Sequence, residues 1–202
     1  MKNLVRIVSV VAVSVVALCS LTTAGAADKL EGIALEWMPT SPMSERAPVD
    51  LQGLERVRLR IEPFTDKRAD PGYIGRNTAQ IPIRKVTTNE DVARFVTYQV
   101  KLLLSELGIE VVETGGNVVL KGEVSKFFVE EAKRYNAEVE LDAIFTDMNG
   151  KMLWGVVATG TSSRFGISYK AANYFEVLSD ALIGATHEMV HNRGFRKALT
   201  GN

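Results

Sequence analysis

Three consecutive stretches of alternating apolar and polar residues in the second half of the chain constrain its fold most. In the middle stretch, Val139 and Leu141 alternate with Glu140, and a period of two places apolar and charged side chains on opposite faces of a strand. Asn149-Gly150, before the last stretch, is a hairpin signal. The sequence therefore predicts an antiparallel meander with one buried face. Its strands cover about residues 118–130, 137–147 and 151–165.

The flanking segments complete a mixed pattern of helices and strands. Residues 57–64 alternate as a strand, and residues 109–112 form a second, short strand. Apolar residues at helical spacing predict one helix between Asn89 and Gly108 and another over about residues 171–191. We therefore expect a single α/β domain in which a mixed sheet of about five strands carries two helices on one face and leaves the other face open.

The N-terminal residues have the three-part layout of a secretory signal peptide. Basic Lys2 and Arg6 precede an apolar stretch at 7–21, and small residues follow it up to a cleavage site after Ala26 or Ala27. This layout predicts export to the periplasm. The expected parts are a signal peptide at 1–26, an N-terminal arm or tether at 27–54 and an α/β envelope domain at 55–202.

The single cysteine, Cys19, lies near the end of the apolar stretch, where a lipid-modified cysteine would lie. The residue before it is the bulky Leu18, whereas a small residue normally precedes a lipidated cysteine. The sequence therefore favours a soluble periplasmic protein over an outer-membrane lipoprotein, and membrane contact is expected only if Cys19 is lipidated.

Charge argues against a nucleic-acid partner. The chain has 24 basic and 24 acidic residues, whereas proteins that bind nucleic acid present a basic surface to its phosphates.

The segment His187-Glu188-Met189-Val190-His191 matches the H-E-x-x-H pattern, in which two histidines bind zinc and the glutamate acts as a general base. No His, Asp, Glu or Cys follows His191 to supply a third ligand. Helical spacing also places both histidines opposite the apolar side of their helix. We therefore expect no catalytic residues, no metal site and no cofactor, and a zinc-dependent hydrolase using His187, Glu188 and His191 remains the alternative.

Two surfaces are candidates for partner contact. Residues 65–88 hold several Pro and Gly residues and are predicted to be a long irregular loop, a kind of segment that often carries function. Strand alternation places some apolar side chains on the open face of the sheet, unless a bulge or twist covers them. The candidate contact residues are Asp66, Arg68 and Tyr73 in the loop and Phe127, Val129 and Ile144 on the sheet.

With this order of elements, the chain resembles the YajG-like family of candidate bacterial envelope lipoproteins. The resemblance covers about residues 55–192 and rests on Asp66-Lys67-Arg68, Gly72-Tyr73-Ile74-Gly75, the helix before Gly108 and the meander before the final helix. It implies a periplasmic α/β domain with no established activity and no catalytic residues. Members are expected to be lipid-anchored, and this chain departs from that pattern at Leu18.

Together these observations predict a non-enzymatic accessory or binding protein of the bacterial envelope. Its partner would be another envelope protein or a second copy of the chain. Besides the zinc hydrolase, the alternative is a structural protein that self-associates through its sheet face or sheet edge.

Overall fold

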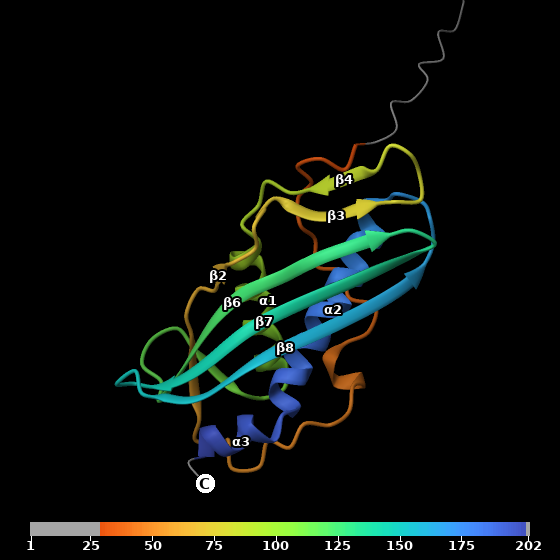
Figure 1. Ribbon diagram of the computed structural model, residues 1–202. Helices are drawn as coiled ribbons and strands as arrows, with labels where there is room; N and C mark the ends of the chain where they lie inside the picture. Colours follow the sequence, from red (N-terminus) through yellow and green to blue (C-terminus); the bar gives the residue numbers. More distant parts are fainter. Residues whose placement is uncertain (1–28, 201–202) are drawn as a thin grey trace, which may run out of the picture.

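Three long antiparallel strands form the centre of the fold (Figure 1). The computed structural model describes residues 29–200, so the predicted signal peptide and Cys19 lie outside the described residues. Strand β7 pairs with β6 on one side and with β8 on the other, which confirms the predicted meander. The three strands are β6 (Val118–Glu131), β7 (Arg134–Asp147) and β8 (Met152–Phe165).

The other edge of β6 pairs with several short strands in succession. Parallel to it lie β1 (Arg58–Ile61), β2 (Thr65–Asp66) and β3 (Tyr73–Asn77). Strand β5 (Glu110–Val112) pairs parallel with β1, and β4 (Arg84–Thr87) pairs antiparallel with β3. The result is one mixed sheet of eight strands in a single α/β domain, which confirms the predicted fold class.

The prediction of one long irregular loop at 65–88 was wrong, because this segment contains β2, β3 and β4. These strands have two, five and four residues, so they are too short to show a clear alternation. Strands β2 and β3 form because β6 offers them a long edge to pair with, and β4 pairs in turn with β3. Ile74 and Val86 are fully buried and tie this part of the sheet to the core.

Helices cover one face of the sheet, as predicted. Helix α1 (Val92–Glu106) contacts β2, β5 and β6, and α2 (Ala171–His191) contacts β6, β7 and β8. The Asp91 side chain caps α1 by accepting a hydrogen bond from the Arg94 N–H at 2.9 Å. A third helix, α3 (Arg193–Thr200), was not predicted and contacts β8 beyond the end of α2. Among the described residues, no helix is both long enough and apolar enough to cross a membrane.

The N-terminal arm runs along α2 in the same direction as the helix (Figure 1). The Met38 N–H donates to the Ser179 hydroxyl at 3.0 Å, and the Thr40 N–H donates to Asp180 at 2.8 Å. A short 3-10 helix, η1 (Met43–Glu45), follows. Three arm side chains enter the core: Leu30, Met43 and Leu54. The arm is therefore part of the folded domain and does not form a free tether.

Candidate functional site

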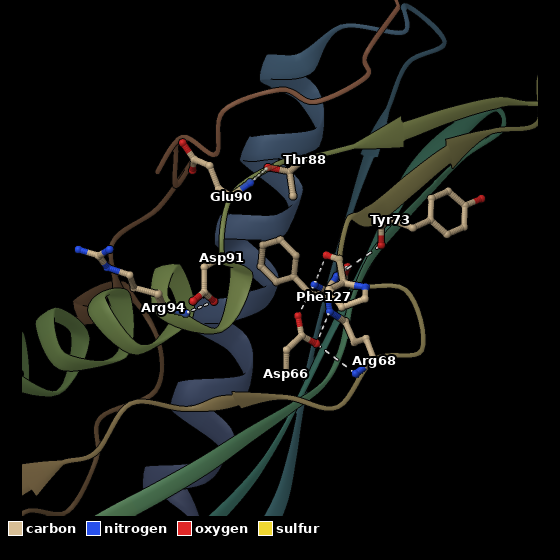
Figure 2. A network of polar contacts seen from close by, with 9 residues as sticks. Asp66, Arg68, Tyr73, Thr88, Glu90, Asp91, Arg94 and Phe127 are labelled. Atoms are coloured by element: carbon tan, nitrogen blue, oxygen red, sulfur yellow. Dashed lines mark hydrogen bonds and ion pairs between the residues drawn. The ribbon is translucent and has the colours of Figure 1, made fainter.

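Asp66 and Arg68, predicted to contact a partner, instead form a largely buried ion pair where β2 ends (Figure 2). The guanidinium donates Nη2–H to Asp66 Oδ2 at 2.6 Å and Nε–H to Oδ1 at 2.9 Å. Nη2 also donates to the carbonyl of Pro71 at 2.5 Å, and Nη1 lies 3.4 Å from the carbonyl of Phe127. Only 7% of the Arg68 side chain is exposed. The pair therefore fastens the segment between β2 and β3 to β6 and leaves little of either side chain for a ligand.

Two opposing effects determine the pKa of the Asp66 carboxyl. Burial raises the pKa of its carboxyl, but the hydrogen bonds and positive charge of Arg68 outweigh burial and hold the pKa below its ordinary value. The carboxylate is therefore ionised at neutral pH and acts as a structural acceptor.

Tyr73, the third predicted contact residue of this segment, begins β3 and is half-buried. Its ring meets the ring of Phe128 edge to face at 5.1 Å, and the Lys85 ammonium lies 5.5 Å from the ring centre. These contacts hold the Tyr73 ring against β6 and β4.

The prediction that Phe127 and Val129 lie on the open face was wrong. They are 1% and 0% exposed. The register of β6 against β7 shifts between Val124 and Lys126, and this bulge at Ser125 reverses the alternation. Phe127 and Val129 therefore face the helices, on the same side as Val124. Ile144 is 43% exposed on the open face, where it was predicted to lie.

Ile144 belongs to an apolar patch on the open face that continues onto β8. Met152 and Val157 are 59% and 56% exposed, and a Cβ placed on Gly155, which pairs with Ile144, would touch the end of the Met152 side chain. We name Ile144, Met152 and Val157 the open-face patch. Among the described residues, no helix covers this side of β7 and β8 (Figure 1).

Charged side chains lie beside the open-face patch, since Lys121 pairs with Ile144 and Asp142 pairs with Val157, and other charged side chains of the sheet form ion pairs. The Lys126 ammonium lies 2.6 Å from the Glu138 carboxylate, and a shallow hollow of about 510 Å³ opens beside this pair near Phe128. Further ion pairs on the sheet are Arg58–Glu110, Arg60–Glu62, Lys67–Glu123, Arg76–Glu130 and Lys121–Glu62. Such exposed pairs contribute little to stability, and they give the rest of this face a surface of mixed charge next to the open-face patch.

The histidine segment has structural contacts that account for its side chains. The Glu188 carboxylate accepts a hydrogen bond from the Thr159 N–H at 2.5 Å, on the edge strand β8. His187 Nε2 lies 2.8 Å from the carbonyl of Ala47 in the arm, and its ring stacks on that of His191. His187 is consequently half-buried, and His191 is exposed. Within residues 29–200, no group of three or more potential metal-binding His, Cys, Asp or Glu residues gathers.

One buried polar cluster was missed by the sequence analysis. Glu131, at the end of β6, is 0% exposed and accepts hydrogen bonds from the Tyr174 hydroxyl at 2.7 Å and the Tyr169 N–H at 2.9 Å. Burial raises the pKa of Tyr174 far above its ordinary value, and the hydrogen bond to Glu131 adds to this shift. The cluster joins β6 to the beginning of α2. Glu131 continues the alternation of Phe127 and Val129, so recognising the bulge would have placed it inside.

A hollow of about 990 Å³ lies between the arm, the end of α2 and α3. It is partly bridged by an ion pair between Asp50 and Arg196. Arg56 and Arg193 also line it. Its open shape and internal ion pair provide no set of convergent groups for a defined ligand.

Comparison with known proteins gives a structural likeness without a sequence match. No family model and no curated protein matches the chain. Protein XCC0632 from Xanthomonas campestris, of family DUF330, has a TM-score of 0.52 at 14% identity over 77% of this chain and 88% of its own. A weaker likeness is to a candidate lipoprotein from Caulobacter crescentus, with a TM-score of 0.41 at 11% identity over 57% of this chain and 83% of its own. A PelC dodecamer structure from Paraburkholderia phytofirmans has a TM-score of 0.33 at 14% identity over 78% of this chain and 92% of its own. The chain therefore shares its fold with the DUF330 protein.

Proposed function

We propose that the protein is a non-enzymatic accessory protein of the bacterial cell envelope that binds another envelope protein through the open-face patch. The signal-peptide layout of residues 1–26 supports a periplasmic location, with attachment to the outer membrane only if Cys19 is lipidated. The resemblance to the YajG-like family and the fold shared with the DUF330 protein agree with this proposal.

The observation that carries the proposal is the composition of the open face. Ile144 and Val157 are diagonal neighbours on adjacent strands, since Ile144 pairs with Gly155 and Asp142 pairs with Val157. Both are exposed, as is Met152, and the charged residues Lys121 and Asp142 lie beside them on β6 and β7. An apolar centre with a polar rim is the usual arrangement of a protein–protein interface.

Site-specific crosslinking in cells tests this proposal. A photo-reactive amino acid at Val157 is expected to capture a partner, and Ile144→Asp in the same chain is expected to abolish the capture. Leu102 on α1 is the control position, because it is 47% exposed and lies on a helix at the opposite face of the sheet. Equal capture from both positions, or none from Val157, would contradict the proposal. A product of two copies of the chain would replace it with self-association.

The non-enzymatic part of the proposal rests on the hydrogen bond between Glu188 and Thr159. A carboxylate held by the edge of β8 has a structural role that needs no metal. Protein purified without a histidine tag is expected to hold less than one zinc per chain. Any peptide or ester hydrolysis in the preparation is expected to be unchanged in Glu188→Gln. Stoichiometric zinc together with hydrolysis that disappears in Glu188→Gln would favour the zinc hydrolase instead.

A further inference from the structure

Two connections expose large apolar side chains to an unusual degree. Ile81 and Ile83, between β3 and β4, are 98% and 58% exposed. Phe165 and Ile167, where β8 leads into α2, are 79% and 64% exposed. Isolated exposed apolar residues are normal, but two loops that each present a pair are not explained by the fold.

Both connections project from the same end of the molecule. The Thr78 N–H donates to the backbone carbonyl of Glu131 at 2.7 Å, and the Tyr169 N–H donates to the Glu131 carboxylate at 2.9 Å. The Arg84 guanidinium lies 5.1 Å from the centre of the Tyr169 ring. Figure 1 shows the β3–β4 connection and the end of β8 on either side of the turn between β6 and β7. We name Ile81, Ile83, Phe165 and Ile167 the apolar tips.

Basic residues accompany the apolar tips. None of them forms an ion pair with another described residue, in contrast to most basic residues on the open face. Exposed carboxylates near this end are those of Glu31, whose neighbour Gly32 donates its N–H to Thr87, and of Glu130, which forms an ion pair with Arg76. The basic residues are Arg84, Lys85, Lys133, Arg134 and Lys170.

The arm enters the fold at the same end. The Leu30 N–H lies 3.4 Å from the Tyr169 hydroxyl, and the Thr87 N–H donates to the Leu30 carbonyl at 2.8 Å. Leu30, at the start of the described residues, therefore lies beside the connection that carries Phe165 and Ile167. A lipid on Cys19 would hold this end, and not the open face, towards a membrane.

We infer that this end of the molecule seats on an anionic lipid bilayer. The apolar tips enter the boundary between headgroups and acyl chains, while the unpaired basic residues lie at the level of the lipid phosphates. Apolar side chains with a surrounding basic surface match the two layers of such an interface. The inference goes beyond the proposed function, because it concerns a different surface and requires no lipid on Cys19.

Vesicle binding tests the inference with the exported protein carrying Cys19→Ala, which cannot be lipidated. It is expected to bind vesicles of phosphatidylethanolamine and phosphatidylglycerol, to bind phosphatidylcholine vesicles much more weakly, and to lose affinity as salt increases. Ile81→Asp and Ile167→Asp are each expected to weaken binding by about tenfold. The matched control is Met148→Asp, because Met148 is 52% exposed in the turn between β7 and β8, at the other end of these strands.

A fluorescent probe locates the contact independently of any loss of affinity. Cys19 is the only cysteine, so Ile81→Cys or Met148→Cys in the Cys19→Ala protein gives one labelling site. An environment-sensitive dye at position 81 is expected to shift to the blue on addition of anionic vesicles, and a dye at position 148 is expected not to shift.

Three results would overturn the inference. They are the absence of binding to anionic vesicles, binding that the tip substitutions leave unchanged, and a concentration-dependent shift at position 81 without vesicles, which would mean that a second copy covers this end. The crosslinking test at Val157 is independent of all three, so failure here and failure of the proposed function are distinguishable.

Discussion

Arg68 illustrates how a charged residue on this chain can be internal to the fold. Its guanidinium bonds Asp66 and the carbonyl of Pro71, and it also approaches the carbonyl of Phe127. Such a pair is costly to break, because removing one partner leaves the other charge buried and uncompensated.

We expect Arg68→Met, which keeps most of the side-chain volume, to lower the free energy of unfolding by about 3 kcal/mol or more. The control is Lys67→Met. Lys67 is adjacent, but its side chain is 57% exposed in its ion pair with Glu123, and its loss is expected to cost about 0.5 kcal/mol. Urea denaturation at pH 7 measures both, and equal effects of the two substitutions would contradict a buried role for Arg68.

The lowered pKa of Asp66 predicts a pH dependence. A carboxyl whose pKa is lower in the folded state stabilises that state above its unfolded pKa, and this stabilisation disappears as pH falls through the folded pKa. We therefore expect wild type to be more stable than Asp66→Asn at pH 7, with the difference shrinking as pH falls below the ordinary value of 3.8. Urea denaturation from pH 7 to pH 2.5 checks this expectation. A difference that stays constant over this range would mean that the Asp66 charge is not responsible.

Among the elements, those long enough to repeat their pattern were predictable. Strands β6, β7 and β8 have 14 residues each, and their alternation and turns identified the meander. The two-residue strand β2 shows no period of its own and exists because β6 pairs with it. Helix α3 buries only Phe195 and Leu199, and two apolar residues are too few to show a helical period in the sequence.

The candidate site was predictable to the same extent. The extra residue of the bulge lies on β6 and not on β7, so the alternation of β7 is uninterrupted and Ile144 faces the open side as this alternation indicates. Phe127 and Val129 lie beyond the bulge at Ser125, and one inserted residue moves every later side chain to the other face. A bulge depends on pairing between strands, so β6 alone could not reveal it.

The contact between α2 and β8 depends on Gly160. A Cβ at this position would overlap the backbone of Ala181 and Ala185 in the helix. We therefore expect Gly160→Ala to push α2 away from the sheet and to lower the free energy of unfolding by about 3 kcal/mol. Thermal and urea denaturation of the purified variant measure this loss.

Gly155→Ala is the matched control on the same strand. The one close approach of its Cβ would be to the end of the Met152 side chain, which is exposed and can turn aside. We expect this substitution to change stability by less than about 1 kcal/mol, because an exposed flexible side chain adjusts at little cost. A loss for Gly160→Ala as small as that for Gly155→Ala would mean that the helix can shift to accommodate a methyl group.

At the scale of the whole molecule, the packing of the N-terminal arm determines where the folded domain begins. The predicted boundary at residue 55 came from the proline-rich, weakly patterned sequence before it. In the structure, the arm pairs with β4 through the Ile33 N–H and the Thr87 carbonyl, and it then follows α2 to the Asp50–Arg196 ion pair. Extended segments of this kind pack without any periodic pattern, so their sequence does not identify them as part of a core.

We expect a chain that begins at residue 29 to fold and one that begins at residue 55 to lack a cooperative thermal transition. The shorter chain loses the burial of Leu30, Met43 and Leu54, which are 6%, 2% and 5% exposed. Burying three such side chains stabilises a domain by about 5 kcal/mol, which is comparable to a typical total stability of about 5–15 kcal/mol. Circular dichroism during heating compares the two chains.

In the longer chain, Met43→Ala is expected to lower the free energy of unfolding by about 2–5 kcal/mol. Glu45→Ala is the control, because it lies in the same short helix but is exposed. A chain from residue 55 that melts cooperatively within a few degrees of the longer one would show that the arm is dispensable. The arm's packing along α2 would then be a consequence of the folded domain and not one of its supports.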